Sequence, residues 1–175
     1  MIQSADLGTY IEHQGRPAIR FVRTYPHPVE RVWCAITDSD ELRAWFPSAV
    51  TLEQRVGGTI TFSFDPNTED STGTVLLCEP PYRLAYTWDG DELHYELEAI
   101  GEGQCRLTFV NVLHERNTAA RNGAGWAVCF AELDRALAGH PAAGPHAETA
   151  TPWQPIYEAY VAAGVPSGAP IPSTS

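Results

Sequence analysis

The sequence has few basic residues, no long apolar run and no paired cysteines. Its 175 residues include 11 basic and 22 acidic side chains, a formal charge of −11 at pH 7. A chain this acidic repels phosphate backbones, which argues against a nucleic-acid partner. No apolar run approaches the roughly 20 residues that cross a bilayer. The first residues also lack the basic and apolar regions of a secretory signal. We therefore expect a cytoplasmic protein without a membrane span.

The four cysteines (Cys34, Cys78, Cys105 and Cys129) are scattered and form no CxxC pair. Zinc sites need closely spaced ligands, so we expect no metal site. Cys34 and Cys129 fall inside apolar helical patterns, which predicts buried, reduced thiols. The sequence also lacks a nucleophile elbow, a His-Glu-x-x-His motif, a phosphate loop and a dinucleotide fingerprint. It therefore offers no catalytic residue and no cofactor site.

What the sequence does contain is an alternation of strands followed by one long helical stripe. Hydrophobic residues make up 43% of the chain, which suits a single folded domain of this length. Four segments from Ile60 to Phe109 alternate apolar and polar residues as strands with one buried face do. After them, apolar side chains recur at helical intervals from Trp126 to Leu137. A sheet with one apolar face and a helix with one apolar stripe are expected to cover each other.

Two shorter helices are expected between an N-terminal hairpin, over Gly8–Tyr25, and the later strands. Val29, Val32, Trp33 and Ile36 have amphipathic spacing after Pro28. A second short helix should follow, with Asp38 as its N-cap and Glu41 completing a capping box. The long helix should span about Thr118–Ala138, capped by Asn117 or Thr118 and ended by Gly139.

The last part of the chain differs in composition. Residues 140–152 are rich in Ala, Gly and Pro and read as a loose linker. Residues 155–163 can form one short amphipathic helix, and the Pro/Gly/Ser-rich tail from Gly164 onward is expected to be disordered. We therefore divide the chain into a domain over residues 1–139 and a C-terminal segment over residues 140–175.

Several short motifs occur together and in order between Gly8 and about Gly139. They are Pro28, Val32-Trp33-Cys34-Ala35-Ile36-Thr37-Asp38, Trp45-Phe46-Pro47, Val56-Gly57-Gly58, Gly73, Glu79-Pro80-Pro81-Tyr82-Arg83-Leu84-Ala85-Tyr86, Trp88, Leu107-Thr108-Phe109 and Gly125-Trp126. This combination resembles the helix-grip (START-like, or SRPBCC) superfamily that includes lipid-transfer domains and the birch-pollen allergen. Within it, the sequence is most similar to the branch named after the activator of the heat-shock-protein-90 ATPase. The resemblance implies an α+β fold, with a curved antiparallel sheet wrapped around a long C-terminal helix.

The resemblance further implies a cavity between sheet and helix that can hold an apolar ligand. By their inward parity, the residues expected to line it are Trp45, Phe62, Phe64, Tyr86, Trp88, Tyr95, Phe109, Asn111, Trp126 and Phe130. Aromatic stripes can equally form a packed core, and the pattern leaves both interpretations open. Asn111 aligns with a strand position where the family often has His. It is either a structural hydrogen-bonding residue or a group that orients a ligand.

The sequence thus favours a protein that binds a small hydrophobic molecule and has no established reaction. Two alternatives stay open: an enzyme similar to the polyketide cyclases or hydrolases of the superfamily, and an interaction module that activates a chaperone ATPase. Enzymatic action would need an acid–base group inside the cavity, where the sequence places only tyrosines and Asn111. The oligomeric state is open too, with a homodimer as one alternative.

Overall fold

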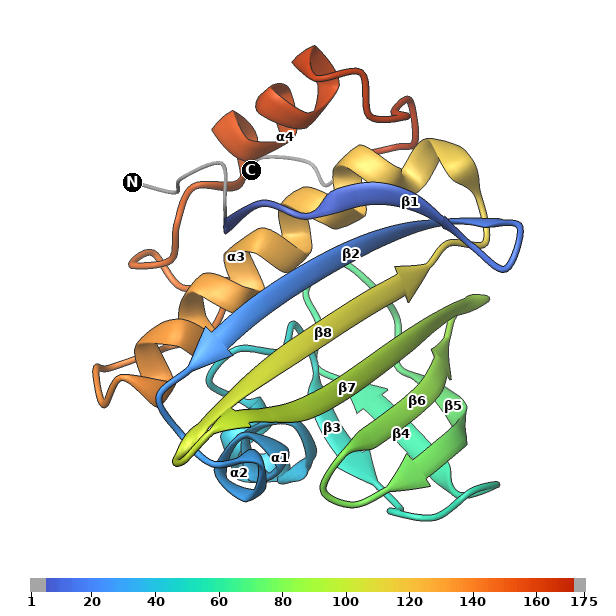
Figure 1. Ribbon diagram of the computed structural model, residues 1–175. Coiled ribbons are helices and arrows are strands. Elements are labelled where there is room, and N and C mark those ends of the chain that lie inside the picture. Colours follow the sequence, from blue (N-terminus) through green and yellow to red (C-terminus); the bar gives the residue numbers. More distant parts are fainter. Residues whose placement is uncertain (1–5, 172–175) are drawn as a thin grey trace.

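The computed structural model describes residues 6–171. Its strands form one curved sheet of eight. The strand order is β1-β2-β8-β7-β6-β5-β4-β3, and all neighbours are antiparallel. The sheet curves around the long helix α3 (Ala119–Leu137), so the predicted α+β helix-grip fold is confirmed (Figure 1). The strands are β1 (Thr9–His13), β2 (Arg16–Tyr25), β3 (Ala49–Leu52), β4 (Thr59–Ser63), β5 (Ser71–Glu79), β6 (Arg83–Trp88), β7 (Asp91–Gly101) and β8 (Gln104–Val112).

Two short helices connect β2 to β3. They are α1 (Val29–Thr37) and α2 (Ser39–Leu42). The predicted N-cap of α2 is confirmed, because the Asp38 carboxylate accepts hydrogen bonds from the backbone N–H groups of Asp40 and Glu41 at 2.9 and 3.2 Å. The Glu41 side chain forms an ion pair with Arg31 at 2.6 Å.

Helix α3 lies within one residue of its predicted bounds, but its N-terminus is built differently. The 3₁₀ turn η2 (Arg116–Thr118) precedes it, and the Thr118 hydroxyl donates to the Glu115 carbonyl instead of capping the helix. The N–H of Ala120 is instead bonded to the Pro166 carbonyl at 2.9 Å. A helix start leaves N–H groups unsatisfied, and the C-terminal segment provides an acceptor for one of them.

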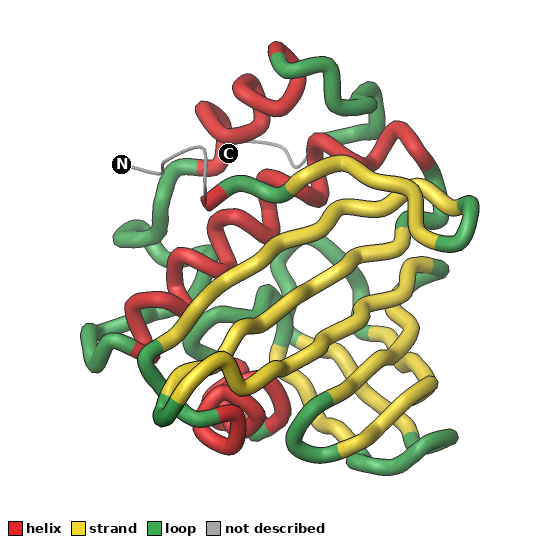
Figure 2. Tube along the Cα trace, in the orientation of Figure 1, coloured by secondary structure: helices red, strands yellow, loops and turns green. Residues whose placement is uncertain are grey.

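Apart from one short helix, the described residues of the C-terminal segment form no helix or strand, but they contact the rest of the domain. Residues 140–171 fold back along α3, with α4 (Trp153–Ala162) on the opposite side of α3 from α1 and α2 (Figure 2). The Ala143 N–H donates to the buried Glu132 carboxylate at 3.1 Å, and Ala169 is itself buried. Prolines restrict the unfolded chain, so ordering such a segment costs less entropy than its composition suggests. Residues 172–175 lie outside the described part.

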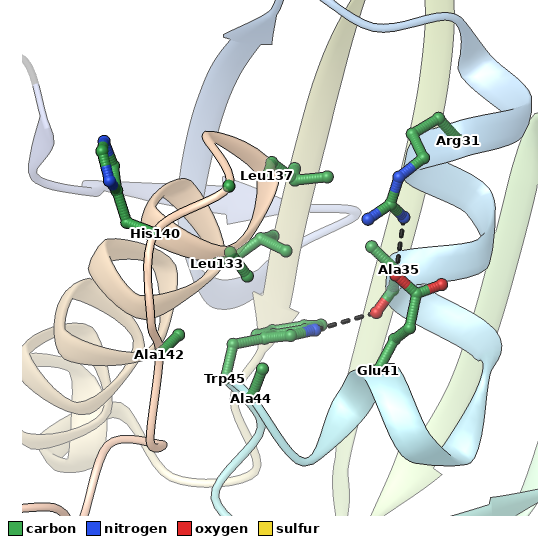
Figure 3. A pocket seen from close by; sticks show the side chains of 11 residues that line it. Arg31, Ala35, Glu41, Ala44, Trp45, Leu133, Leu137, His140 and Ala142 are labelled. Carbon is green, nitrogen blue, oxygen red and sulfur yellow. Dashed lines mark hydrogen bonds and ion pairs between the residues drawn. The ribbon is translucent and has the colours of Figure 1, made fainter.

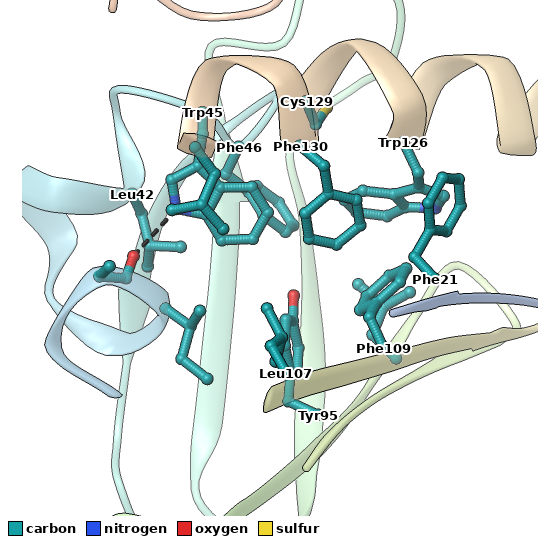
Figure 4. Packing of buried hydrophobic residues seen from close by; sticks show 14 of the residues in the cluster. Phe21, Leu42, Trp45, Phe46, Tyr95, Leu107, Phe109, Trp126, Cys129 and Phe130 are labelled. Atoms are coloured by element: carbon teal, nitrogen blue, oxygen red, sulfur yellow. Dashed lines mark hydrogen bonds between the residues drawn. The ribbon is translucent and has the colours of Figure 1, made fainter. Parts of the chain in front are cut away.

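The side of the sheet that faces α3 carries a dense aromatic core. Trp45 stacks on Phe130 with ring centroids 5.6 Å apart, and Phe109 meets Phe130 edge-on at 5.0 Å. Figure 4 shows these rings between α3 and the sheet. Trp126, Phe130 and Leu133 are all buried here, as the helical stripe predicted.

The cysteines are all free, but not all are buried. Cys105 and Cys129 are buried, Cys78 is half-buried and Cys34 is exposed. Burial of Cys34 was expected and is wrong, because α1 turns Val32, Trp33 and Ile36 toward the core and leaves position 34 at the solvent. No helix within residues 6–171 is long and apolar enough to cross a membrane.

Candidate functional site

Six of the aromatic residues expected to line a cavity pack against one another instead. They are Trp45, Phe62, Tyr86, Tyr95, Phe109 and Phe130, all at most 2% exposed. The hydroxyl groups of Tyr86 and Tyr95 are hydrogen-bonded to each other at 2.8 Å, which gives each a partner in the apolar interior. These rings therefore form a closed core under the middle of α3.

Phe64 does not belong to the interior at all. It was expected to point inward with Ile60 and Phe62, but it is 87% exposed. Strand β4 ends at Ser63, and Phe64 has φ +59°, a conformation that breaks the alternation of the strand. Its N–H donates to the Asp70 carboxylate at 3.2 Å, which closes the loop between β4 and β5. The prediction that Phe64 points inward and lines the cavity is thus wrong.

A cavity of about 420 Å³ opens at one end of the aromatic core. It lies where the β6–β7 turn, the first half of α3, the loop after β4 and the C-terminal segment meet. The indole rings of Trp88, Trp126 and Trp153 supply much of its apolar wall. Of the residues predicted for the site, Trp88, Asn111 and Trp126 line it. Its volume is in the range of small-molecule pockets.

Asn111 lies at this cavity with both ends of its amide engaged. Its Oδ1 accepts from Trp126 Nε1 at 3.0 Å and from Asn122 Nδ2 at 3.4 Å, and its Nδ2 donates to Asp91 Oδ2 at 2.9 Å. The residue is 1% exposed. This network holds Trp126 and Asp91 in place, so Asn111 has the structural role that was one of the two alternatives. Direct ligand contact by Asn111 stays a prediction.

Asp91 is one of several polar residues of the cavity that were not predicted from the sequence. Asp89 and Gly90 both have positive φ, forming a tight turn that starts β7 at Asp91. Its Oδ1 accepts from the His114 N–H at 2.8 Å, and its Oδ2 accepts from the amides of Asn111 and Asn122. Burial raises the pKa of this carboxyl above its ordinary value, although these hydrogen bonds and the charge of Arg121 oppose the shift.

Two signals in the sequence place Asp91 and Asn122 on inward faces, although they do not pair the two residues. Asp91 has the same strand parity as Leu93 and Tyr95, both of which are buried. Asn122 precedes Trp126 by four residues, which places the two on one helix face.

The opposite wall joins the C-terminal segment to the loop after β4. The Asp65 carboxylate accepts from Asn67 N–H at 2.8 Å and from Ser48 Oγ at 3.3 Å. His146 Nε2 lies 3.8 Å from that carboxylate and 2.9 Å from the Pro47 carbonyl. His146 therefore ties the residues after α3 to this side of the cavity.

Trp88 lines the cavity and packs against the aromatic core. Its ring stacks on Phe62 at 5.1 Å and meets Trp126 edge-on at 5.9 Å. Its indole N–H is buried and has no hydrogen-bond partner among the described residues. A buried donor without an acceptor is uncommon in a folded protein and costs free energy.

A second hollow, of about 360 Å³, lies between α1, α2 and the last turns of α3 (Figure 3). The Arg31–Glu41 ion pair stands on one side, and Leu133 and Leu137 on the other. Trp45 also lines it, with its Nε1 bonded to the Ala35 carbonyl at 2.9 Å. The polar groups on the α1–α2 side thus bind each other, which favours the first cavity as the candidate site.

The curved antiparallel sheet, the long helix and the cavity at one end of their interface define a protein of the helix-grip class. A family model described as "Activator of Hsp90 ATPase homolog 1-like protein" matches residues 26–138. The chain belongs to this family. No curated protein matches the chain.

Solved structures show the same fold. A conserved protein of unknown function from Enterococcus faecalis has a TM-score of 0.71 at 19% identity, with 89% of each chain covered. The solution structure of CalU16 from Micromonospora echinospora has a TM-score of 0.67 at 25% identity, covering 89% of this chain and 90% of that one. The Aha1 dimer from Colwellia psychrerythraea has a TM-score of 0.57 at 24% identity, covering 69% and 95%.

Proposed function

We propose that the protein binds a small, largely apolar molecule in the cavity between Trp88, Trp126 and Trp153. The observation that carries this proposal is the composition of that wall: three indole rings together with a few fixed polar groups. Ligand sites in proteins combine apolar walls with a small number of oriented polar atoms.

The two alternatives are weaker. An enzyme would need an acid–base group at the reacting atoms. Asp91 is a carboxyl at the cavity wall, and its three accepted hydrogen bonds fix its orientation but identify no reaction. Activation of a chaperone ATPase rests on the family description and on two structures described as an Aha1 dimer and an HSP90 activator. Their fold gives no activity to this chain by itself. A cytoplasmic location and a homodimer also remain proposals.

The neutral fluorophore N-phenyl-1-naphthylamine provides a direct test, because its emission rises in an apolar site. We expect saturable binding to the wild-type protein and loss of that binding in Gly125→Leu. Gly125 lines the cavity, and a Cβ built there meets no atom within 4 Å, so the leucine would occupy open space.

Ala136→Leu is the matched control, because Ala136 lies on the same helix but lines the second hollow. It should leave binding unchanged, with both variants checked for folding by circular dichroism. Binding lost in Ala136→Leu and kept in Gly125→Leu would move the site to the second hollow. No saturable binding to the wild-type protein would count against a ligand cavity.

A further inference from the structure

The cavity wall carries more negative than positive charge. Three carboxylates line it, from Asp65, Asp89 and Asp91, against one arginine, Arg121, and the imidazole of His146. The whole chain is also acidic, with a formal charge of −11. An anionic ligand would therefore enter against the field of the protein, and a cation would be attracted by it.

The hydrogen-bond donors of Asp91 are all neutral. They are the side-chain amides of Asn111 and Asn122 and the backbone N–H of His114. Within residues 6–171 no arginine or histidine forms an ion pair with Asp91, whereas Asp65 has His146 at 3.8 Å. A partly buried carboxylate without a counter-ion is costly to hold in its charged form.

Arg121 acts on Asp91 only from a longer range. Its guanidinium donates to Asn122 Oδ1 at 3.1 Å and to the Pro170 carbonyl at 3.1 Å. Its attraction lowers the pKa of Asp91, but burial outweighs it and the pKa stays raised. A positive charge in direct contact with Asp91 would thus have to come from a ligand.

The indole rings of the cavity favour the same charge. Trp88, Trp126 and Trp153 line the same cavity, and the face of an indole attracts a cation more strongly than other aromatic faces do. A carboxylate and indole rings in one cavity can bind an ammonium group together, the carboxylate through its negative charge and the rings through the quadrupole of their π-systems. A neutral apolar ligand would use the rings but leave Asp91 without a counter-ion.

We propose that the cavity selects molecules bearing a positively charged amine on an aromatic or aliphatic body, with Asp91 as the counter-ion of that amine. The inference rests on the proposed function, because it specifies the ligand of the same cavity. It assigns Asn111 and Asn122 the task of orienting the Asp91 carboxylate by their two amide hydrogen bonds.

Three naphthalene derivatives that differ in charge test this selection: 1-naphthylmethylamine, 1-naphthylmethanol and 1-naphthoic acid. Isothermal titration calorimetry at pH 7 should give the amine about tenfold tighter binding than the alcohol, the order expected for one charge-assisted contact. The acid should bind most weakly. In Asp91→Asn, the advantage of the amine over the alcohol should fall to about twofold or less, while the alcohol keeps its affinity, since its binding does not depend on the charge.

Asp40→Asn removes the same charge from an exposed position on α2 and should keep the full advantage of the amine. Equal binding of amine and alcohol to the wild-type protein, or tighter binding of the acid, would overturn the inference. So would an amine advantage that persists in Asp91→Asn. If N-phenyl-1-naphthylamine binds but none of the three derivatives does, the charge selection fails and the proposed function stands. If that fluorophore does not bind either, both fail.

Discussion

Trp126 connects the aromatic core to the cavity, so its replacement tests the fold argument directly. Its side chain is 5% exposed, its ring lies 4.8 Å from that of Phe109 and 5.6 Å from that of Phe46, and its Nε1 donates to Asn111. Trp126→Ala removes the ring and the hydrogen bond together. We expect the free energy of unfolding to fall by about 3–5 kcal/mol, as for other buried aromatic side chains.

Trp126→Phe separates the two contributions, because it keeps a ring but removes the indole N–H. It should lower the free energy of unfolding by about 1–3 kcal/mol, since the Asn111 amide oxygen keeps only the long bond from Asn122. Urea unfolding followed by circular dichroism at 222 nm measures both variants without depending on tryptophan emission. An alanine variant within about 0.5 kcal/mol of wild type, the range of surface substitutions, would show that Trp126 is not part of the core.

A double-mutant cycle isolates the hydrogen bond itself. Combining Trp126→Phe with Asn111→Leu should cost less than the sum of the two single changes, by about 0.5–1.5 kcal/mol, because both remove the same bond. Strict additivity would mean that this bond contributes nothing measurable to stability.

Three further predictions follow from other positions. Gly125→Ala should raise the free energy of unfolding by up to about 1 kcal/mol, because alanine favours the helix and its methyl meets open space, and it should weaken binding of N-phenyl-1-naphthylamine; loss of stability would contradict it. Gly73→Ala should lower stability by about 1–3 kcal/mol in urea unfolding, because its Cβ would overlap the Thr87 backbone carbonyl; a neutral effect would refute this contact. The raised pKa of Asp91 means that the folded state binds a proton at a higher pH than the unfolded chain does. The stabilisation that comes from this proton is therefore largest below the unfolded pKa of about 3.9, and it is lost as the pH rises through the folded pKa. Urea unfolding between pH 4 and 7 should therefore show a weaker decline of stability with pH in Asp91→Asn than in wild type, and identical profiles would show that Asp91 does not titrate in this way.

The fold could be predicted from the sequence because two periodicities agree with each other. The alternation along β6, β7 and β8 and the stripe from Trp126 to Leu137 each define one apolar face, and the two faces have to meet. The bounds of α3 differed by one residue at each end. Alternation fails where a strand stops, and Phe64 shows the result: one residue beyond β4, a positive φ turns the side chain into solvent.

The candidate site was only partly predictable, because parity indicates the interior and does not distinguish core from cavity. Tyr86 and Phe109 point inward as Asn111 does, yet only Asn111 is at the cavity. Whether a ring packs or leaves a space depends on neighbours from distant parts of the chain. For the same reason the bonds that join Asp91 to Asn111 and Asn122 could not be read from spacing.

The C-terminal segment shows why family membership does not by itself define the ligand. The family model ends at residue 138, and Trp88, Asp91 and Trp126 lie within it. Pro145, His146 and Trp153 lie beyond it and complete the cavity wall. The division at residues 139 and 140, drawn from composition, thus passes through the site, and a chain ending at 139 would leave one side of the cavity open. Affinity for a small molecule depends on how much of its surface the site encloses. The proposed ligand site therefore depends on a segment that the family match does not cover, held in place by the bonds of Glu132 and His146.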